Sequence, residues 1–208
     1  MPLYKTVIIN KNTKVLIWKI EESIDDLSCR FSLTEKSKKK LMNMKSEIHQ
    51  KGFLSIRCLL ELEGYSDQDL SYDIFGKPHL RDGKFISITH SFMFSGIIIS
   101  SEMPVGIDIE KRRDKILKIA HKFTPIEAYK SIANHDALVS KLTIVWGAKE
   151  SLYKIYGKKK LLFLNHMFIE DFSFETNHTI GKILYDGKTS DYRVFFLEIE
   201  DFTCVYAY

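Results

Sequence analysis

Each half of the chain begins and ends with segments typical of strands, and between them apolar residues recur at the wider spacing of amphipathic helices. Two short β-rich segments, residues 4–9 and 15–20, flank Asn10-Lys11-Asn12 and predict an opening hairpin. Apolar residues then recur at helical spacing from about residue 33 to 62. The pattern predicts strands again at residues 85–89, 94–100 and 105–110.

Helical spacing returns after this third strand, at residues 116–121, 124–132 and, over the longest stretch, 137–156. Asn134 or Asp136 is expected to cap the long helix, and Gly157 to end it. Aromatic and β-branched residues then alternate between turns and predict antiparallel sheet, in segments 161–174, 179–185, 192–199 and 203–206. Because strands and helices are grouped in runs, the predicted class is α+β.

The composition is that of a folded globular chain. Of the 208 residues 45 % are hydrophobic and 28 % charged, which excludes disordered and fibrous classes. No apolar run reaches the length of a signal peptide or a membrane span. The three cysteines, Cys29, Cys58 and Cys204, have neither the number nor the spacing of a disulfide framework or a zinc site. We therefore expect a cytoplasmic protein without membrane contact.

The net charge of +4 is small, but the positive charges are clustered. Such clusters are consistent with solvated faces, and equally with a surface for phosphates or an acidic partner protein. The clusters are Lys36, Lys38, Lys39 and Lys40; Lys111, Arg112, Arg113 and Lys115; and Lys158, Lys159 and Lys160.

Two carboxylates share one face of the predicted strand 105–110. Alternate side chains of a strand point the same way, so Asp108 and Glu110 lie side by side, opposite the apolar positions. The pair fits a surface strand face, or a site for Mg²⁺, which binds to one or two carboxylates together with substrate phosphates.

The long helix carries a second group of polar side chains. Trp146, Lys149, Glu150 and Lys154 fall within about 140° of one another on a helical wheel. A surface salt bridge between Glu150 and Lys154 explains the pair. The salt bridge does not explain a tryptophan on the same face. The alternative is that Glu150 adds a third carboxylate to Asp108 and Glu110 and completes a site for a metal and a pyrophosphate.

Possible phosphate ligands occur in a third region. Lys77 lies between Gly76 and Pro78, and His90 lies at a strand end between two hydroxyl residues. Each is also an ordinary turn or surface residue.

Four segments together resemble a known family: FGKPHL (75–80), SITHS (87–91), VGIDIE (105–110) and WGAKESLYK (146–154). They are similar to the 4'-phosphopantetheinyl transferase superfamily, in particular its surfactin-synthetase-activating type. The family pattern is G-[IV]-D, about forty residues, then [FW]-[SCT]-x-K-E-[AS]-x-x-K. Here 37 residues separate Asp108 from Trp146. Gly147 departs from the pattern, since the family has Ser, Cys or Thr there.

The resemblance implies a pseudo-two-fold arrangement of two similar α+β halves with the substrate between them. Residues 1–103 would supply coenzyme A phosphate contacts, and residues 104–208 the metal-binding carboxylates and the signature helix. The implied reaction moves 4'-phosphopantetheine from coenzyme A to a serine of an apo acyl or peptidyl carrier protein, releasing adenosine 3',5'-bisphosphate. Fatty acid, polyketide and nonribosomal peptide biosynthesis all use such carriers. We expect a monomer with no nucleic-acid partner.

The resemblance also implies residue roles. Asp108, Glu110 and Glu150 would hold Mg²⁺, and Glu150 would accept the serine proton, directly or through a metal-bound water. Lys149 and Lys154 would stabilise charge developing on the phosphates during catalysis. The clusters at 111–115 and 158–160 would meet an acidic carrier, as would FTPIE (123–127), unless Phe123 is a core residue. The residues expected to contact coenzyme A are Arg57, Lys77, His90, Ser91, Lys149 and Lys154.

Two other functions use the same residue types. A Mg²⁺-dependent phosphodiesterase would hydrolyse its substrate without a carrier protein. A non-catalytic basic module that binds nucleotide or nucleic acid would tolerate Glu150→Gln, whereas a transferase would lose turnover.

Overall fold

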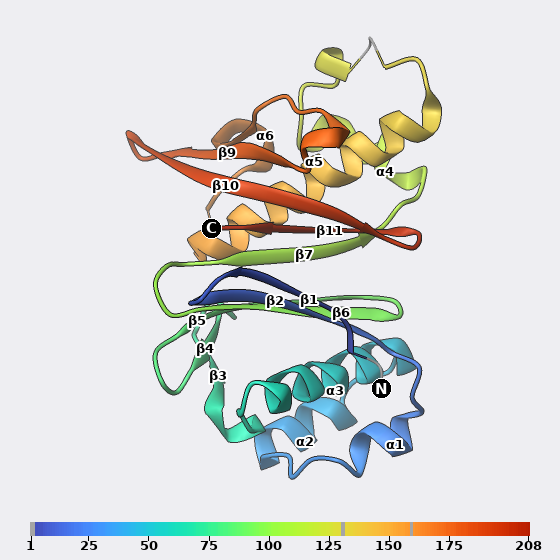
Figure 1. The fold of residues 1–208 in the computed structure, drawn as a ribbon, viewed down its shortest axis with the longest axis vertical. Coiled ribbons are helices and arrows are strands. Elements are labelled where there is room, and N and C mark those ends of the chain that lie inside the picture. Colours follow the sequence, from blue (N-terminus) through green and yellow to red (C-terminus); the bar gives the residue numbers. More distant parts are fainter. Residues whose placement is uncertain (1–2, 130–131, 159) are drawn as a thin grey trace. The chain divides into compact units, whose positions relative to one another are not determined.

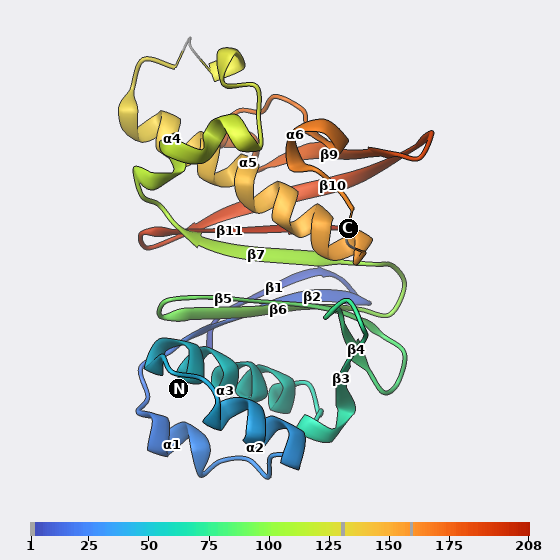
Figure 2. The same cartoon turned by 180° about the vertical axis from the view of Figure 1, so that it is seen from behind.

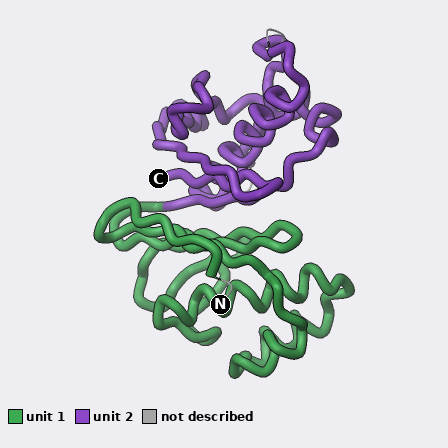
Figure 3. Tube along the Cα trace, turned by 45° about the vertical axis from the view of Figure 1, so that its right-hand side comes forward, with its two compact units in different colours: residues 1–104 green, residues 105–208 purple. Residues whose placement is uncertain are grey.

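The computed structural model describes residues 3–129, 132–158 and 160–208. Helices and strands are present in similar amounts, which confirms the predicted α+β class. The chain divides into two compact units, residues 1–104 and 105–208 (Figure 3). The sequence-based boundary was one residue earlier, between 103 and 104.

The first unit is built on a four-stranded antiparallel sheet with strand order β1-β2-β6-β5, and β3 and β4 form a separate two-stranded ribbon (Figure 1). The predicted opening hairpin is present, with its turn at Lys11 and Asn12. The strands are β1 (Leu3–Asn10), β2 (Thr13–Lys19), β3 (Leu70–Tyr72), β4 (Pro78–Leu80), β5 (Phe85–Ser91) and β6 (Phe94–Ser100).

Three helices and a short 3-10 turn complete this unit: α1 (Ile24–Ser28), α2 (Glu35–Met42), α3 (Glu47–Leu62) and η1 (Asp67–Asp69). The sequence predicted the α2 and α3 region as helical, but α1 and the β3–β4 ribbon were not expected. The core of the unit forms where α3 packs on one face of the sheet. Leu54 and Leu59 of α3 are fully buried there, as is Ile97 of β6. Side chains on this face of β5 therefore point toward α3.

The second unit has a five-stranded antiparallel sheet with order β7-β11-β10-β9-β8. Helix α5 lies along one face of it (Figure 2). The strands are β7 (Gly106–Lys111), β8 (Met167–Ile169), β9 (His178–Tyr185), β10 (Lys188–Ile199) and β11 (Phe202–Ala207). The other elements are α4 (Lys115–Ile119), η2 (Ala120–Lys122), η3 (Ile126–Tyr129), α5 (His135–Tyr156), α6 (Phe163–His166) and η4 (Phe174–Thr176).

The ends of α5 follow the predicted capping chemistry. The Asn134 side chain accepts a hydrogen bond from the backbone of Ala137, and Gly157 ends the helix with a left-handed φ of 69°. Between them, Ile144, Ala148 and Leu152 are buried against the sheet. This packing fixes the rotation of the helix and therefore which side chains face β7.

Two sequence predictions in this unit are only partly right. The segment 161–174 was expected to be strand, but only Met167–Ile169 is extended and a helical turn precedes it. The predicted helix 124–132 is a 3-10 turn at Ile126–Tyr129, and residues 130 and 131 lie outside the described residues. Phe163 and Phe172 of the first segment, and Ile126 and Tyr129 of the second, pack against buried residues of α5, so tertiary contacts outweigh the local pattern.

In the described part of the chain, no helix is long and apolar enough to cross a membrane. The side chains of Cys58 and Cys204 are buried, as expected for small core residues, whereas Cys29 is exposed.

Candidate active site

Two of the recognised sequence segments meet where β7 contacts α5. A Cβ atom added to Gly106 would lie only 2.0 Å from the main-chain oxygen of Ser151. The Ser151 hydroxyl donates to the carbonyl of Val205, 3.1 Å away on β11. Only glycine permits so close an approach of strand and helix. Gly106 thereby brings the carboxylates of β7 beside the polar face of α5.

Asp108 is held by Lys154. The Lys154 ammonium donates to Asp108 Oδ1 at 2.9 Å and to the main-chain oxygen of Ile107 at 2.7 Å. The Asp108 side chain is 8 % exposed and that of Lys154 28 %. Lys154 thus joins α5 to β7, and its observed ion-pair partner is Asp108 instead of the expected Glu150.

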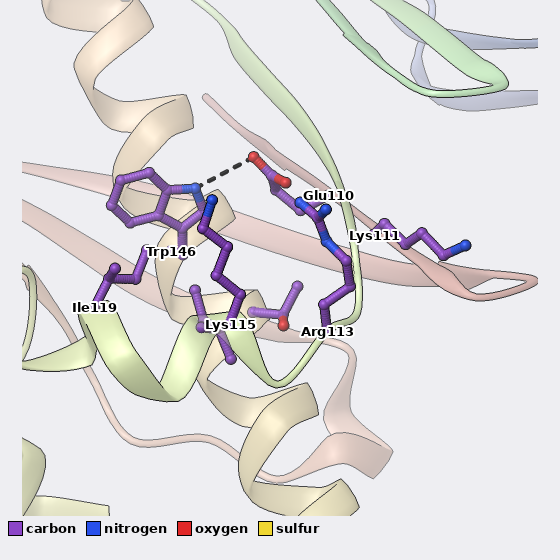
Figure 4. Close-up of a pocket in the computed structure, with 8 residues that line it drawn as sticks. Glu110, Lys111, Arg113, Lys115, Ile119 and Trp146 are labelled. Atoms are coloured by element: carbon purple, nitrogen blue, oxygen red, sulfur yellow. Dashed lines mark hydrogen bonds between the residues drawn. The ribbon is translucent and has the colours of Figure 1, made fainter.

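Glu110 lies next to the signature tryptophan. The Trp146 indole N–H donates to Glu110 Oε1 at 3.3 Å (Figure 4). The indole also packs on Phe123 and Phe163, with ring centroids 5.1 and 5.2 Å away. Burial, together with the charge of Asp108, raises the pKa of Glu110 to about 7. Trp146 therefore belongs to the polar group, as its place on the helix face indicated.

Glu150 projects from α5 toward the same carboxylates. Burial raises its pKa to about 7, and the charges of Asp108 and Glu110 act in the same direction. Lys154 opposes this shift. The charge of Asp108 thus disfavours the ionisation of both glutamates, which is an electrostatic condition that a divalent cation would relieve.

The donor set fits Mg²⁺ by its chemistry. Three carboxylates from one strand and one helix are hard oxygen ligands. Among the described residues, however, no group of three His, Cys, Asp or Glu side chains is arranged closely enough to hold a metal ion. Asp108 is ion-paired with Lys154 in this arrangement.

Lys149 differs from the sequence expectation. Its side chain runs into the interior, where the residue is 2 % exposed. The ammonium donates to the main-chain oxygens of Phe123 and Phe163, the latter at 2.8 Å. Burial lowers its pKa to about 8. This environment gives Lys149 a structural role, fixing two segments on α5, in place of the expected contact with phosphate.

A pocket of about 170 Å³ opens beside Glu110 and Trp146. Figure 4 shows Arg113 and Lys115 extending along it from the segment that leads into α4. Thr143 also lines the pocket and was not expected from the sequence; its place three residues before Trp146 puts it on the same helix face. The lining residues are Glu110, Lys111, Arg113, Lys115, Ile116, Ile119, Thr143 and Trp146.

Gly147, which departs from the family pattern, is a close packing position. An added Cβ would lie 2.8 Å from Val205 Cγ2 and 3.7 Å from Asp108 Oδ2. Even the smallest side chain would therefore require the Val205 side chain or α5 to shift.

The first unit carries the remaining predicted ligands. His90 and Ser91 are neighbours at the end of β5 and point to opposite faces of the strand. Lys77 lies at the end of a tight turn, in which the Asp73 carboxylate accepts hydrogen bonds from the backbone N–H groups of Phe75 and Lys77. Burial lowers the pKa of the half-buried Lys77 side chain.

Arg57 is an interior residue, contrary to its expected contact with nucleotide. Its guanidinium is 4 % exposed, lies 2.8 Å from Asp67 Oδ1 and stacks 3.5 Å above the Phe53 ring. It also donates to the carbonyl of Phe53. Because the guanidinium of Arg57 is buried in this ion pair, Arg57 is not part of the proposed site.

Two segments that were expected to face a carrier protein, residues 123–127 and 158–160, differ in their exposure. Phe123 is fully buried against Trp146, so the core reading of this residue applies. Lys158 and Lys160 are exposed, and Lys159 lies outside the described residues.

Carboxylates that lie this close together are the kind of ligands that hold divalent cations in many phosphoryl-transfer enzymes. Residues 104–207, half of the chain, match the 4'-phosphopantetheinyl transferase superfamily. The chain belongs to this superfamily, which suggests phosphopantetheinyl transfer in general. No curated protein matches the chain at a significant level.

Proposed function

We propose that this protein, a member of the surfactin-synthetase-activating type, transfers the 4'-phosphopantetheine group of coenzyme A to a serine hydroxyl of an apo carrier protein. The reaction would depend on Mg²⁺ and release adenosine 3',5'-bisphosphate. The observation that carries the proposal is the electrostatic coupling of Asp108 with Glu110 and Glu150, in the half of the chain that matches the superfamily.

Asp108, Glu110 and Glu150 would hold the metal. A bound Mg²⁺ would neutralise charge on the coenzyme A pyrophosphate and on the departing phosphate. Trp146 holds one oxygen of Glu110, and Lys154 holds one oxygen of Asp108. Both contacts restrict the carboxylates before substrate binds.

Glu150 is our proposed base for the serine proton. The serine proton would pass to the Glu150 carboxylate directly or through a metal-bound water.

The basic side chains near the pocket would meet the carrier. Arg113, Lys115 and Lys118 are exposed on the segment that begins α4, and carriers of the family are acidic around their serine. Lys77, His90 and Ser91 in the first unit stay our proposed coenzyme A contacts. Location in the cytoplasm and a monomeric state also stay predictions.

The test is intact mass spectrometry of apo acyl and peptidyl carrier proteins after incubation with the protein, coenzyme A and Mg²⁺. We expect one phosphopantetheine group to be added to the carrier, and the gain to be lost on chelation of the metal. Glu150→Gln should nearly abolish the transfer, while Glu175→Gln, which changes an exposed carboxylate of the same unit, should retain it.

The other outcomes point elsewhere. Hydrolysis of coenzyme A without any carrier would favour a phosphodiesterase. Undiminished transfer by Glu150→Gln would contradict the assignment of the metal and base. Absence of both transfer and coenzyme A binding would overturn the proposal.

A further inference from the structure

The imidazole of His90 lies directly on the backbone of helix α3. A Cβ atom added to Gly52 would lie 2.7 Å from His90 Cδ2 and 3.0 Å from His90 Cγ. His90 shares its face of β5 with Ile86 and Ile88, which contact the α3 core. Any larger residue at position 52 would occupy the space of the histidine ring.

A pair of buried serines sets this close approach. The Ser55 hydroxyl donates to the carbonyl of Gly52 at 3.0 Å and lies 2.7 Å from the hydroxyl of Ser95. Each hydroxyl has one proton, so Ser95 donates to Ser55. Ser95 is the residue of β6 that pairs with His90 across the sheet. The helix is therefore anchored to the sheet at the level of His90.

His49 contacts the same ring from the side. It lies three residues before Gly52, on the first turn of α3, and its ring is 5.8 Å from that of His90 at an interplanar angle of 86°. Edge-to-face contacts at this distance are favourable. His49 and His90 are both exposed, so the contact leaves the His90 ring accessible to a ligand.

We propose that Gly52 and His49 are positioning residues, which fix the imidazole of His90 for contact with a phosphate group of coenzyme A. The inference rests on the proposed function, in which His90 is such a contact. A histidine that is held in one rotamer before binding loses less conformational entropy when the ligand arrives. Gly52 supplies the surface under the ring and His49 the contact at its edge.

The test compares His49→Ala, His49→Phe and Gly52→Ala by calorimetric titration with coenzyme A and by NMR of the histidine ring signals. His49→Ala should weaken coenzyme A binding about 3- to 10-fold, the size expected for losing one ring contact. His49→Phe keeps the ring and should restore most of the affinity. Gly52→Ala should weaken binding at least as much and shift the His90 signal, because the imidazole must move away from its position against α3.

The matched control is His178→Ala. This exposed histidine of the second unit also loses one ring contact, at 5.8 Å to Phe195, and it should change neither the affinity nor the His90 signal. In the transfer assay, the KM for coenzyme A should rise more than kcat falls for His49→Ala.

Three results would overturn the inference. One is an unchanged His90 signal and affinity in both His49→Ala and Gly52→Ala. Another is a His49→Phe variant that binds as weakly as His49→Ala, because His49 would then contact the ligand itself. The third is wild-type protein that fails to bind coenzyme A. Normal binding of coenzyme A without transfer to a carrier would instead overturn the proposed function alone, since the titration and the NMR signal would still report on the position of the His90 ring.

Discussion

Lys154 Nζ lies 2.9 Å from Asp108 Oδ1, so a single ion pair connects the last turns of the signature helix to the carboxylate strand. The same ammonium donates to the carbonyl of Ile107. The lysine that the sequence assigned to phosphate thus also holds Asp108, a proposed metal ligand, in place.

Replacing Lys154 with methionine should destabilise the protein. The substitution removes the charge that offsets Asp108, next to two further carboxylates, and leaves the carbonyl of Ile107 without this donor. We expect a loss of about 1–3 kcal/mol in the free energy of unfolding, measured by urea denaturation. Lys154→Arg, which keeps the charge, should lose less. A midpoint equal to wild type in Lys154→Met would contradict the importance of this ion pair.

Lys149→Met separates the structural role from the catalytic one. The carbonyls of Phe123 and Phe163 would both lose their hydrogen bond from Lys149, so unfolding should become easier by about 1–3 kcal/mol. If Lys149 instead acts on phosphate, the variant would keep its stability and lose turnover. Urea denaturation and the carrier transfer assay, run on the same preparation, distinguish the two.

The site could be predicted from the sequence to the extent that it follows one regular pattern. The alternation that places Asp108 and Glu110 together is a property of any strand, and it needs no tertiary information. The helical wheel likewise placed Glu150 and Lys154 near each other. It failed for Lys149, because angular position cannot tell whether a side chain at the margin of a polar face turns outward or into the interior.

Packing partners were beyond sequence reasoning. Arg57 has a suitable charge for a phosphate, and only the position of Asp67, in a separate short turn, shows that it is already paired. The strand predicted across residues 161–174 likewise became a turn and a three-residue strand, because its aromatic residues pack around α5. Such outcomes depend on distant parts of the chain.

Asp67→Asn tests the buried ion pair through the pH dependence of stability. Burial alone would raise the pKa of Asp67, but hydrogen bonds from Thr34 and Ser37 and the charge of Arg57 outweigh it, so the folded pKa lies below 3.8. A carboxyl group whose pKa is lower in the folded than in the unfolded protein stabilises the fold at any pH above its unfolded pKa. This stabilisation is lost as the pH falls through the pKa of the folded protein. Wild type should therefore exceed the variant in stability at pH 6, and the difference should shrink below pH 4. Parallel curves in urea denaturation from pH 6 to pH 3 would contradict this.

The contact of Gly147 with Val205 explains why this chain carries glycine at its departure from the family pattern. Alanine at position 147 would gain up to about 1 kcal/mol in helix propensity. Its Cβ would nevertheless lie 2.8 Å from Val205 Cγ2, and overpacking of this kind costs about 1–3 kcal/mol. We therefore expect Gly147→Ala to destabilise the wild type. In a Val205→Ala background the Cγ2 atom is gone, so the same substitution should cost at least about 1 kcal/mol less. Thermal or urea unfolding of the four proteins in this cycle measures the coupling, and additive effects would show that the β11 contact does not select glycine.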